Sequence, residues 1–203
     1  FALCRFDRLQ PLGAAAAGVC AGAGVGESAA FSMRKDEIGE ARMPVEDAGD
    51  RAFMREALSL ARRGVGEGAG GPFGALVVRD GHVLGRGWNR VIADHDPTAH
   101  AELVAIRDAC KAIGEFQLSG ATLYSTCEPC PMCGAAAYWA RLDRVVFAAG
   151  TADAAAIGFD DGRIREALAT GEGSLRLPMR QLMRDEALEV FRLWQGSPLR
   201  VDY

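Results

Sequence analysis

Three features are missing from this sequence of 203 residues, and each absence excludes a class of protein. No stretch holds the roughly 18 consecutive apolar residues of a membrane-spanning helix, so we expect no membrane partner. There is no basic excess, because 23 Lys and Arg stand against 27 Asp and Glu, for a formal net charge of −4. A broad nucleic-acid interface needs clustered Lys and Arg, so nucleic acid is not expected as a partner.

The third absence is the cysteine pattern of a small domain stapled by disulfides. Of the six cysteines, Cys4 and Cys20 lie in an Ala/Gly-rich N-terminal segment. Cys127, Cys130 and Cys133 instead fall within seven residues. Spacing this tight is typical of metal binding or catalysis in a reducing compartment. We therefore expect a cytoplasmic protein.

The composition that is present is that of a globular protein with one compact domain. Hydrophobic residues make up 49% of the chain and charged residues 25%. The N-terminal part differs, because residues 11–30 are Ala/Gly-rich without apolar periodicity and the chain starts with Phe rather than Met. We expect residues 1–50 to be a low-complexity, disordered leader or a misassigned start, and residues 51–203 to form the domain.

Hydrophobic periodicity predicts alternating helices and strands after residue 50. A first helix runs from residue 51 to the glycines that begin at residue 64, and Asp80-Gly81 predicts a tight hairpin turn. Further helices are predicted at 99–113, 130–141, 161–169 and 186–194, and strands at 75–78, 82–88, 121–125, 144–149 and 175–179. The fourth strand is expected to be buried, whereas Pro178 makes the fifth an edge strand or a loop. This order favours an α/β fold with helices on both faces of a sheet.

Two short stretches carry residues suited to catalysis. His100-Ala101-Glu102 opens one predicted helix, and Cys130 and Cys133 lie three residues apart at the start of the next. On the first turn of a helix both sulfurs can face one point, and the positive helix end favours thiolates. With a neutral imidazole from His100 they make three protein ligands for Zn²⁺ and leave a fourth position for water.

Glu102, two residues after the histidine, is the candidate proton shuttle. Zinc acidifies its bound water, so zinc-bound hydroxide is the expected nucleophile and Glu102 the group that moves its proton to the substrate. The pattern H-x-E followed by P-C-x-x-C is the signature of zinc deaminases. Two alternatives remain open: a structural zinc-binding module with Cys127 as fourth ligand, and a redox-active C-x-x-C pair.

The sequence around these motifs resembles the cytidine-deaminase-like zinc hydrolase superfamily, and within it the bacterial guanine deaminases. The resemblance covers nearly all of residues 51–203. It rests on residues 70–75, 96–102, 105–107, 127–133, 138–141 and 158–161, and on Phe191, Trp194 and Tyr203 near the end. It implies a three-layer α/β/α fold with a mixed five-stranded sheet, and zinc-dependent hydrolysis of guanine to xanthine and ammonia in purine catabolism.

The resemblance also implies how a purine base would be bound. It places at Asn89 an amide that can both donate and accept hydrogen bonds, and at Asp161, beside Asp160, a carboxylate for the ring N–H groups. Phe73 would form an apolar wall. Plainer interpretations are a turn at Asn89, a helix cap at the two aspartates and ordinary core packing at Phe73. A homodimer is implied, with a swapped C-terminal segment whose Tyr203 closes the neighbouring pocket; a frayed terminus is the alternative.

Other deaminase activities compete with this prediction. The tRNA-specific adenosine deaminases share the Trp88-Asn89-Arg90 and 96–102 stretches, so these stretches do not discriminate. Phe73, Pro131 and the acidic stretch at 159–161 favour the guanine type, as does the net charge. Guanosine, pterins and aminotriazines stay open as substrates.

Overall fold

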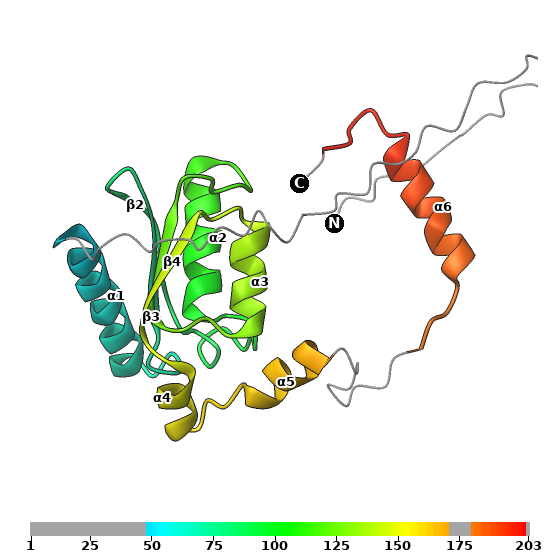
Figure 1. The fold of residues 1–203 in the computed structure, drawn as a ribbon. Helices are drawn as coiled ribbons and strands as arrows, with labels where there is room; N and C mark the ends of the chain where they lie inside the picture. Colours follow the sequence, from blue (N-terminus) through cyan, green and yellow to red (C-terminus); the bar gives the residue numbers. More distant parts are fainter. Residues whose placement is uncertain (1–47, 171–179, 202–203) are drawn as a thin grey trace, which may run out of the picture. The chain divides into compact units, whose positions relative to one another are not determined.

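The computed structural model describes residues 48–170 and 180–201 (Figure 1). All of these residues lie within one compact unit, residues 45–203. The helices are α1 (Ala48–Gly66), α2 (Ala101–Ile113), α3 (Pro131–Trp139), α4 (Thr151–Ala156), α5 (Gly162–Thr170) and α6 (Arg184–Gln195). The strands are β1 (Gly74–Arg79), β2 (His82–Trp88), β3 (Thr122–Cys127) and β4 (Arg144–Ala149). The leader predicted for residues 1–50 falls almost wholly outside the described residues.

The four strands form one mixed sheet in the order β2-β1-β3-β4. β1 is antiparallel to both β2 and β3, whereas β3 and β4 are parallel. Asp80 and Gly81 have φ values of 52° and 75°, and these positive angles are those of the predicted hairpin turn. The strand predicted at 175–179 lies outside the described residues, so the described sheet has four strands.

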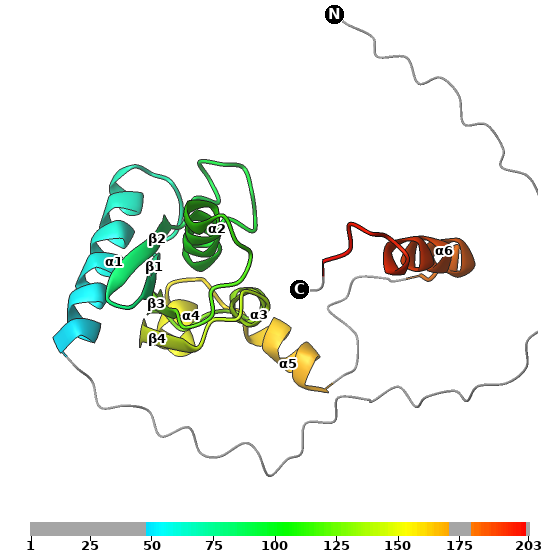
Figure 2. The same ribbon diagram turned by 90° about the horizontal axis from the view of Figure 1, so that it is seen from above.

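Helices cover both faces of this sheet, which confirms the predicted α/β fold (Figure 2). Because side chains alternate along a strand, Leu76 and Val78 of β1 pack against α1. Ala75 and Val77 face the other way, into a core shared with α2 and α3. β1 is therefore buried on both faces, which explains its nearly continuous apolar sequence.

Two glycines of β2 allow α2 to lie directly against the sheet. A Cβ atom built at Gly85 would lie 2.3 Å from the carbonyl oxygen of Ala105. A Cβ atom at Gly87 would lie 2.2 Å from that of Ala101. Contacts this short do not occur, so the missing side chains determine how closely α2 approaches β2.

Two local predictions differ from the structure. β4 was expected to be buried, but it pairs only with β3 among the described strands, and Phe147 and Ala148 are exposed. An apolar run does not reveal whether a strand is central or at an edge. The short helix α4 was not predicted, because six residues are too few to show a helical period. None of the described helices is long and apolar enough to cross a membrane.

Candidate active site

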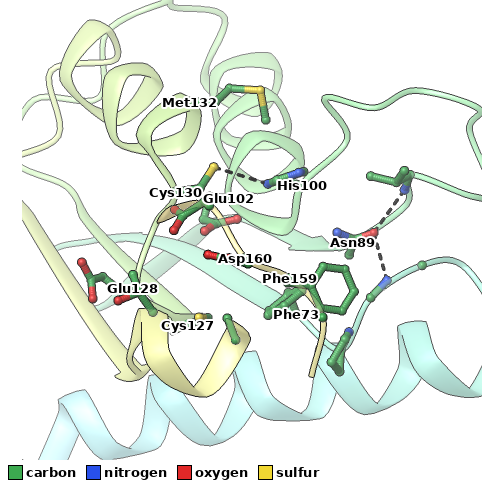
Figure 3. A pocket seen from close by; sticks show the side chains of 18 of the residues that line it. Phe73, Asn89, His100, Glu102, Cys127, Glu128, Cys130, Met132, Phe159 and Asp160 are labelled. Atoms are coloured by element: carbon green, nitrogen blue, oxygen red, sulfur yellow. Dashed lines mark hydrogen bonds between the residues drawn. The ribbon is translucent and has the colours of Figure 1, made fainter. Parts of the chain in front are cut away.

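The start of α2 and the start of α3 bring the three candidate metal ligands, His100, Cys130 and Cys133, together. Figure 3 shows two of them, His100 and Cys130. His100 is the N-cap residue of α2, and Cys130 is the N-cap residue of α3, both with extended backbone. Pro131 at the first position of α3 has no N–H to leave unpaired, which favours a helix start there. Cys133 follows on the first turn of α3 and is fully buried.

The geometry of the three residues fits a zinc ion. The Nδ1 atom of His100 lies 3.6 Å from Sγ of Cys130 and 3.5 Å from Sγ of Cys133. Tetrahedral zinc, with bonds of about 2.0 Å to nitrogen and about 2.3 Å to sulfur, requires this separation of about 3.6 Å. Among the described residues Cys127 is not part of the group, and its Sγ lies 3.8 Å from the carbonyl oxygen of Gly150. The closed site with four protein ligands therefore receives no support.

Hydrogen bonds within the cluster shift the pKa values of its members in different directions. A hydrogen bond from Cys133, which outweighs the effect of burial, lowers the pKa of the Cys130 thiol to about 4. The same hydrogen bond, together with burial, raises the pKa of Cys133. The hydrogen bond with Cys130 also raises the pKa of His100. Cys130 is thus readily a thiolate, the form that binds zinc.

Glu102 lies beside the metal ligands on the first turn of α2. Its side chain is buried, and burial raises the pKa of its carboxyl group. A carboxyl group with a raised pKa both accepts and returns a proton near neutral pH more readily than an exposed one. This is the property expected of a proton shuttle.

A cavity of about 990 Å³ opens over these groups. The predicted site residues that line it are Phe73, Asn89, His100, Glu102, Cys130, Asp160 and Asp161. Cys133 does not line the cavity, and Tyr203 lies outside the described residues. The sequence interpretation did not assign a role to Phe159, Glu128 or Ile164, which also line it.

Asn89 is buried, and its orientation is held by the backbone. Its Oδ1 atom accepts hydrogen bonds from the N–H groups of Gly71, at 3.1 Å, and Val91, at 3.2 Å. A Cβ atom at Gly70 would lie 2.1 Å from Oδ1, so only glycine fits beside it. Because Oδ1 accepts these two backbone hydrogen bonds, the amide presents its other end, the Nδ2 donor, to the cavity. The expected amide that both donates and accepts is therefore a donor (Figure 3).

Phe73 and Phe159 form an aromatic pair in the cavity wall. Their ring centroids are 4.9 Å apart, with an interplanar angle of 85°. Edge-to-face contacts of this kind are favourable and hold both rings in place. Phe159 lies within the 158–161 stretch on which the resemblance rests, but its pairing with Phe73 had no signal in the sequence.

Asp160 and Asp161 lie just before the start of α5, and both also line the cavity. Oδ1 of Asp160 accepts a hydrogen bond of 2.8 Å from the backbone N–H of Gly162, where α5 begins. Asp161 accepts from Nε of Arg165, at 2.9 Å and 3.0 Å to its two oxygens. Arg165 was missed in the sequence, although its i,i+4 spacing from Asp161 was visible.

Comparison with known proteins assigns the family. Residues 48–149, which span α1 to β4, match the cytidine and deoxycytidylate deaminase zinc-binding region. The three candidate ligands and Glu102 all lie within this match. The chain belongs to this deaminase family. The predicted zinc-deaminase signature is thereby confirmed, and the deaminase family implies zinc as the cofactor.

Two kinds of deaminase are similar to this chain. Guanine deaminase from Bacillus subtilis is 44% identical over 151 residues, which cover 74% of this chain and 97% of the relative. Its crystal structure gives a TM-score of 0.71 and covers 75% of this chain and 98% of that chain. The tRNA-specific adenosine deaminase of Haemophilus influenzae is 41% identical over 132 residues, which cover 62% of this chain and 76% of the relative. The resemblance to bacterial guanine deaminases is thus confirmed.

Proposed function

We propose that this protein hydrolyses guanine to xanthine and ammonia with zinc as its cofactor. The observation that carries the proposal is that the buried Glu102 lines one cavity together with His100 and Cys130 of the His/Cys/Cys cluster, and that this cavity has a polar donor and an aromatic wall. The similarity to guanine deaminase, which runs through 97% of that relative, supports guanine as the substrate.

His100, Cys130 and Cys133 would hold the zinc ion. When bound there, zinc lowers the pKa of a water molecule and so supplies a nucleophile at neutral pH. Glu102 would take a proton from the attacking water molecule and hold it while the oxygen of that water bonds to the ring carbon that carries the exocyclic amine. Glu102 would then give that proton to the adjacent ring nitrogen. It would move the remaining proton of the added hydroxyl group to the amine, so that the ring C=O forms as the C–N bond breaks and ammonia leaves.

The other cavity residues would orient the flat purine. Nδ2 of Asn89 donates to the carbonyl oxygen of guanine, and the carboxylates of Asp160 and Asp161 accept from ring N–H groups. Phe73 and Phe159 pack against the apolar parts of the rings. These side chains match the hydrogen-bond donors and acceptors of guanine. A base with donors where guanine has acceptors would leave them unpaired and would bind more weakly.

A panel of substrates tests this function. The zinc-loaded protein is assayed for ammonia release from guanine, guanosine, adenine, cytosine, cytidine and a tRNA anticodon stem-loop. We expect turnover of guanine with little activity on guanosine. Activity confined to the stem-loop would instead support a tRNA-specific adenosine deaminase, the second candidate, which the 41% identical relative favours. Zinc binding without any turnover would support a structural zinc-binding module.

Two variants separate the roles of the shuttle and the ligands. Glu102→Gln removes the proton-accepting oxygen but no metal ligand, so we expect normal zinc content and a fall in turnover of at least about 100-fold. Cys130→Ala removes a ligand and should lose both zinc and turnover. Measured zinc content and initial rates distinguish the two, and an active Glu102→Gln variant would refute the shuttle.

We also propose a cytoplasmic homodimer with exchanged C-terminal segments. Tyr138 and Trp139 on α3 are 68% and 59% exposed, and Phe191 on α6 is 61% exposed, so apolar surface is available for a second copy. In this proposal residues 175–179 add the fifth strand, and Tyr203 closes the pocket of the partner. A reducing compartment would keep the candidate ligand thiols free of disulfides.

Removal of residues 199–203 tests the exchanged segment. We expect lower turnover of guanine with unchanged zinc content and an unchanged melting temperature, because the deletion opens the pocket without altering the ligands.

Sedimentation should show a dimer for the full chain and a monomer for Trp139→Glu, which places a charge on the proposed interface. Unchanged turnover after the deletion contradicts the closing role of Tyr203.

A further inference from the structure

Arg165 on α5 connects two separate segments at the edge of the candidate active site. Its Nε atom donates to both oxygens of Asp161, at 2.9 Å and 3.0 Å. Its Nη2 atom donates to the carbonyl oxygen of Pro129 at 2.9 Å, and Nη1 lies 3.4 Å from Oε1 of Glu128. One guanidinium group therefore binds three acceptors, two of which are 36 and 37 residues away in the chain.

The acceptors of Arg165 matter because of where they lie. Asp161 and Glu128 line the cavity, and Pro129 directly precedes the candidate ligand Cys130. Arg165 itself does not line the cavity, and its side chain is 35% exposed. Its contacts thus reach the site only through other groups.

The charges around Arg165 favour a cation at this position. The carboxylates of Asp161 and Glu128 both contact its guanidinium group, and without the cation these two like charges in a partly buried site would repel one another. The planar fork of arginine can donate in several directions at once, which a lysine ammonium cannot do while holding the same geometry. Two bonds to Asp161 also restrict the rotation of its carboxylate, so less entropy is lost when a ligand binds.

We propose that Arg165 is a positioning residue that holds the Asp161 carboxylate in its binding orientation and ties α5 to the segment carrying Cys130. The inference rests on the proposed function, in which Asp161 accepts from the ring N–H groups of guanine. Arg165 has no contact with Glu102 among the hydrogen bonds and ion pairs of the described residues. Its loss should therefore weaken substrate binding more than it slows proton transfer.

Kinetics of three variants test this role. We expect Arg165→Ala to raise KM for guanine about 3–10-fold, a modest effect because the pair is partly exposed, with kcat within about twofold of wild type. Arg165→Lys keeps the charge but loses the fork, so its KM should remain raised at least about threefold. The matched control is Arg63→Ala, which removes another i,i+4 ion pair of 2.7 Å, between Arg63 on α1 and Glu67 just after the helix, and should leave KM unchanged.

Equilibrium binding supplies a readout that does not depend on turnover. The Kd for guanine is measured in Glu102→Gln with and without Arg165→Ala, and we expect the second change to raise Kd about 3–10-fold at equal zinc content. A wild-type protein without guanine turnover refutes the proposed function, whereas an active wild type with unchanged KM and Kd in Arg165→Ala refutes the positioning role. If Arg165→Ala loses zinc or fails to fold, Arg165→Lys decides, and a KM within twofold of wild type overturns the proposal.

Discussion

At the residue scale, the two ends of the Asn89 amide have different surroundings: the oxygen binds the backbone and the nitrogen faces the cavity. Its oxygen accepts from two backbone N–H groups, so its nitrogen must face the cavity. The residue type alone does not determine this, because an unrestrained amide can rotate and exchange its donor and acceptor. A role in the turn and the proposed role in substrate binding are therefore compatible in this one side chain.

Asn89→Asp separates these two functions. The aspartate keeps an acceptor for Gly71 and Val91 but replaces the donor that faces the cavity, so we expect KM for guanine to rise about 10–100-fold with little change in melting temperature. Asn89→Ala leaves both backbone N–H groups without their acceptor and should also lower stability by about 1–3 kcal/mol. Steady-state kinetics and thermal unfolding provide the measurements. A wild-type KM in Asn89→Asp would show that the amide does not bind the substrate.

At the element scale, the position of α2 on the sheet decides where His100 and Glu102 stand. α2 begins immediately after His100, and its first turn lies over Gly87 of β2. The helix itself was predictable, because its apolar residues recur at helical spacing. Its distance from the sheet was not, since that depends on glycines in another element.

Gly87→Ala tests this dependence. The new methyl group would meet the carbonyl oxygen of Ala101, so the first turn of α2 must shift. We expect a loss of about 1–3 kcal/mol in the free energy of unfolding and weaker zinc binding, because His100 moves with that turn. Gly66→Ala is the matched control, since nothing lies within 4 Å of the Cβ position there. The free energy of unfolding is measured by chemical unfolding, and the affinity for zinc by titration. If both values were the same in Gly87→Ala, Gly66→Ala and wild type, the position of α2 would not depend on Gly87.

At the scale of the whole molecule, an ion-pair network joins the first helix to strands β3 and β4 of the sheet. Asp50 of α1 accepts a hydrogen bond of 2.6 Å from Nη2 of Arg144 on β4 and another from the hydroxyl group of Tyr124 on β3. Burial opposes ionisation of Asp50, but these two hydrogen bonds outweigh it and lower its pKa. Burial and the nearby Asp50 raise the pKa of Tyr124 to about 12.

This network predicts a pH-dependent contribution to stability. A carboxyl group whose pKa is lowered by folding stabilises the protein above its unfolded pKa of about 3.9, and the contribution is lost as pH falls through the folded pKa. Asp50→Asn should therefore cost about 1–3 kcal/mol at pH 7, and the difference from wild type should shrink below about pH 4. Unfolding by urea at pH 7, 4 and 3 measures it. A difference that stays constant with pH would exclude the network as its source.

The sequence by itself determined the features that depend on near neighbours. The longer helices, the Asp80-Gly81 hairpin and the two motifs, His100-Ala101-Glu102 and Cys130 to Cys133, were predictable, because backbone propensity and ligand spacing within a motif act over a few residues. The packing of α2 and α3 brings these two motifs together. Only the tertiary structure decided the amide orientation of Asn89, the pairing of Phe73 with Phe159 and the exposure of β4. It also decided that Arg165, whose partner Asp161 is local, reaches Pro129 across 36 residues. Such contacts depend on how elements pack, and packing is set by surfaces distant in the chain.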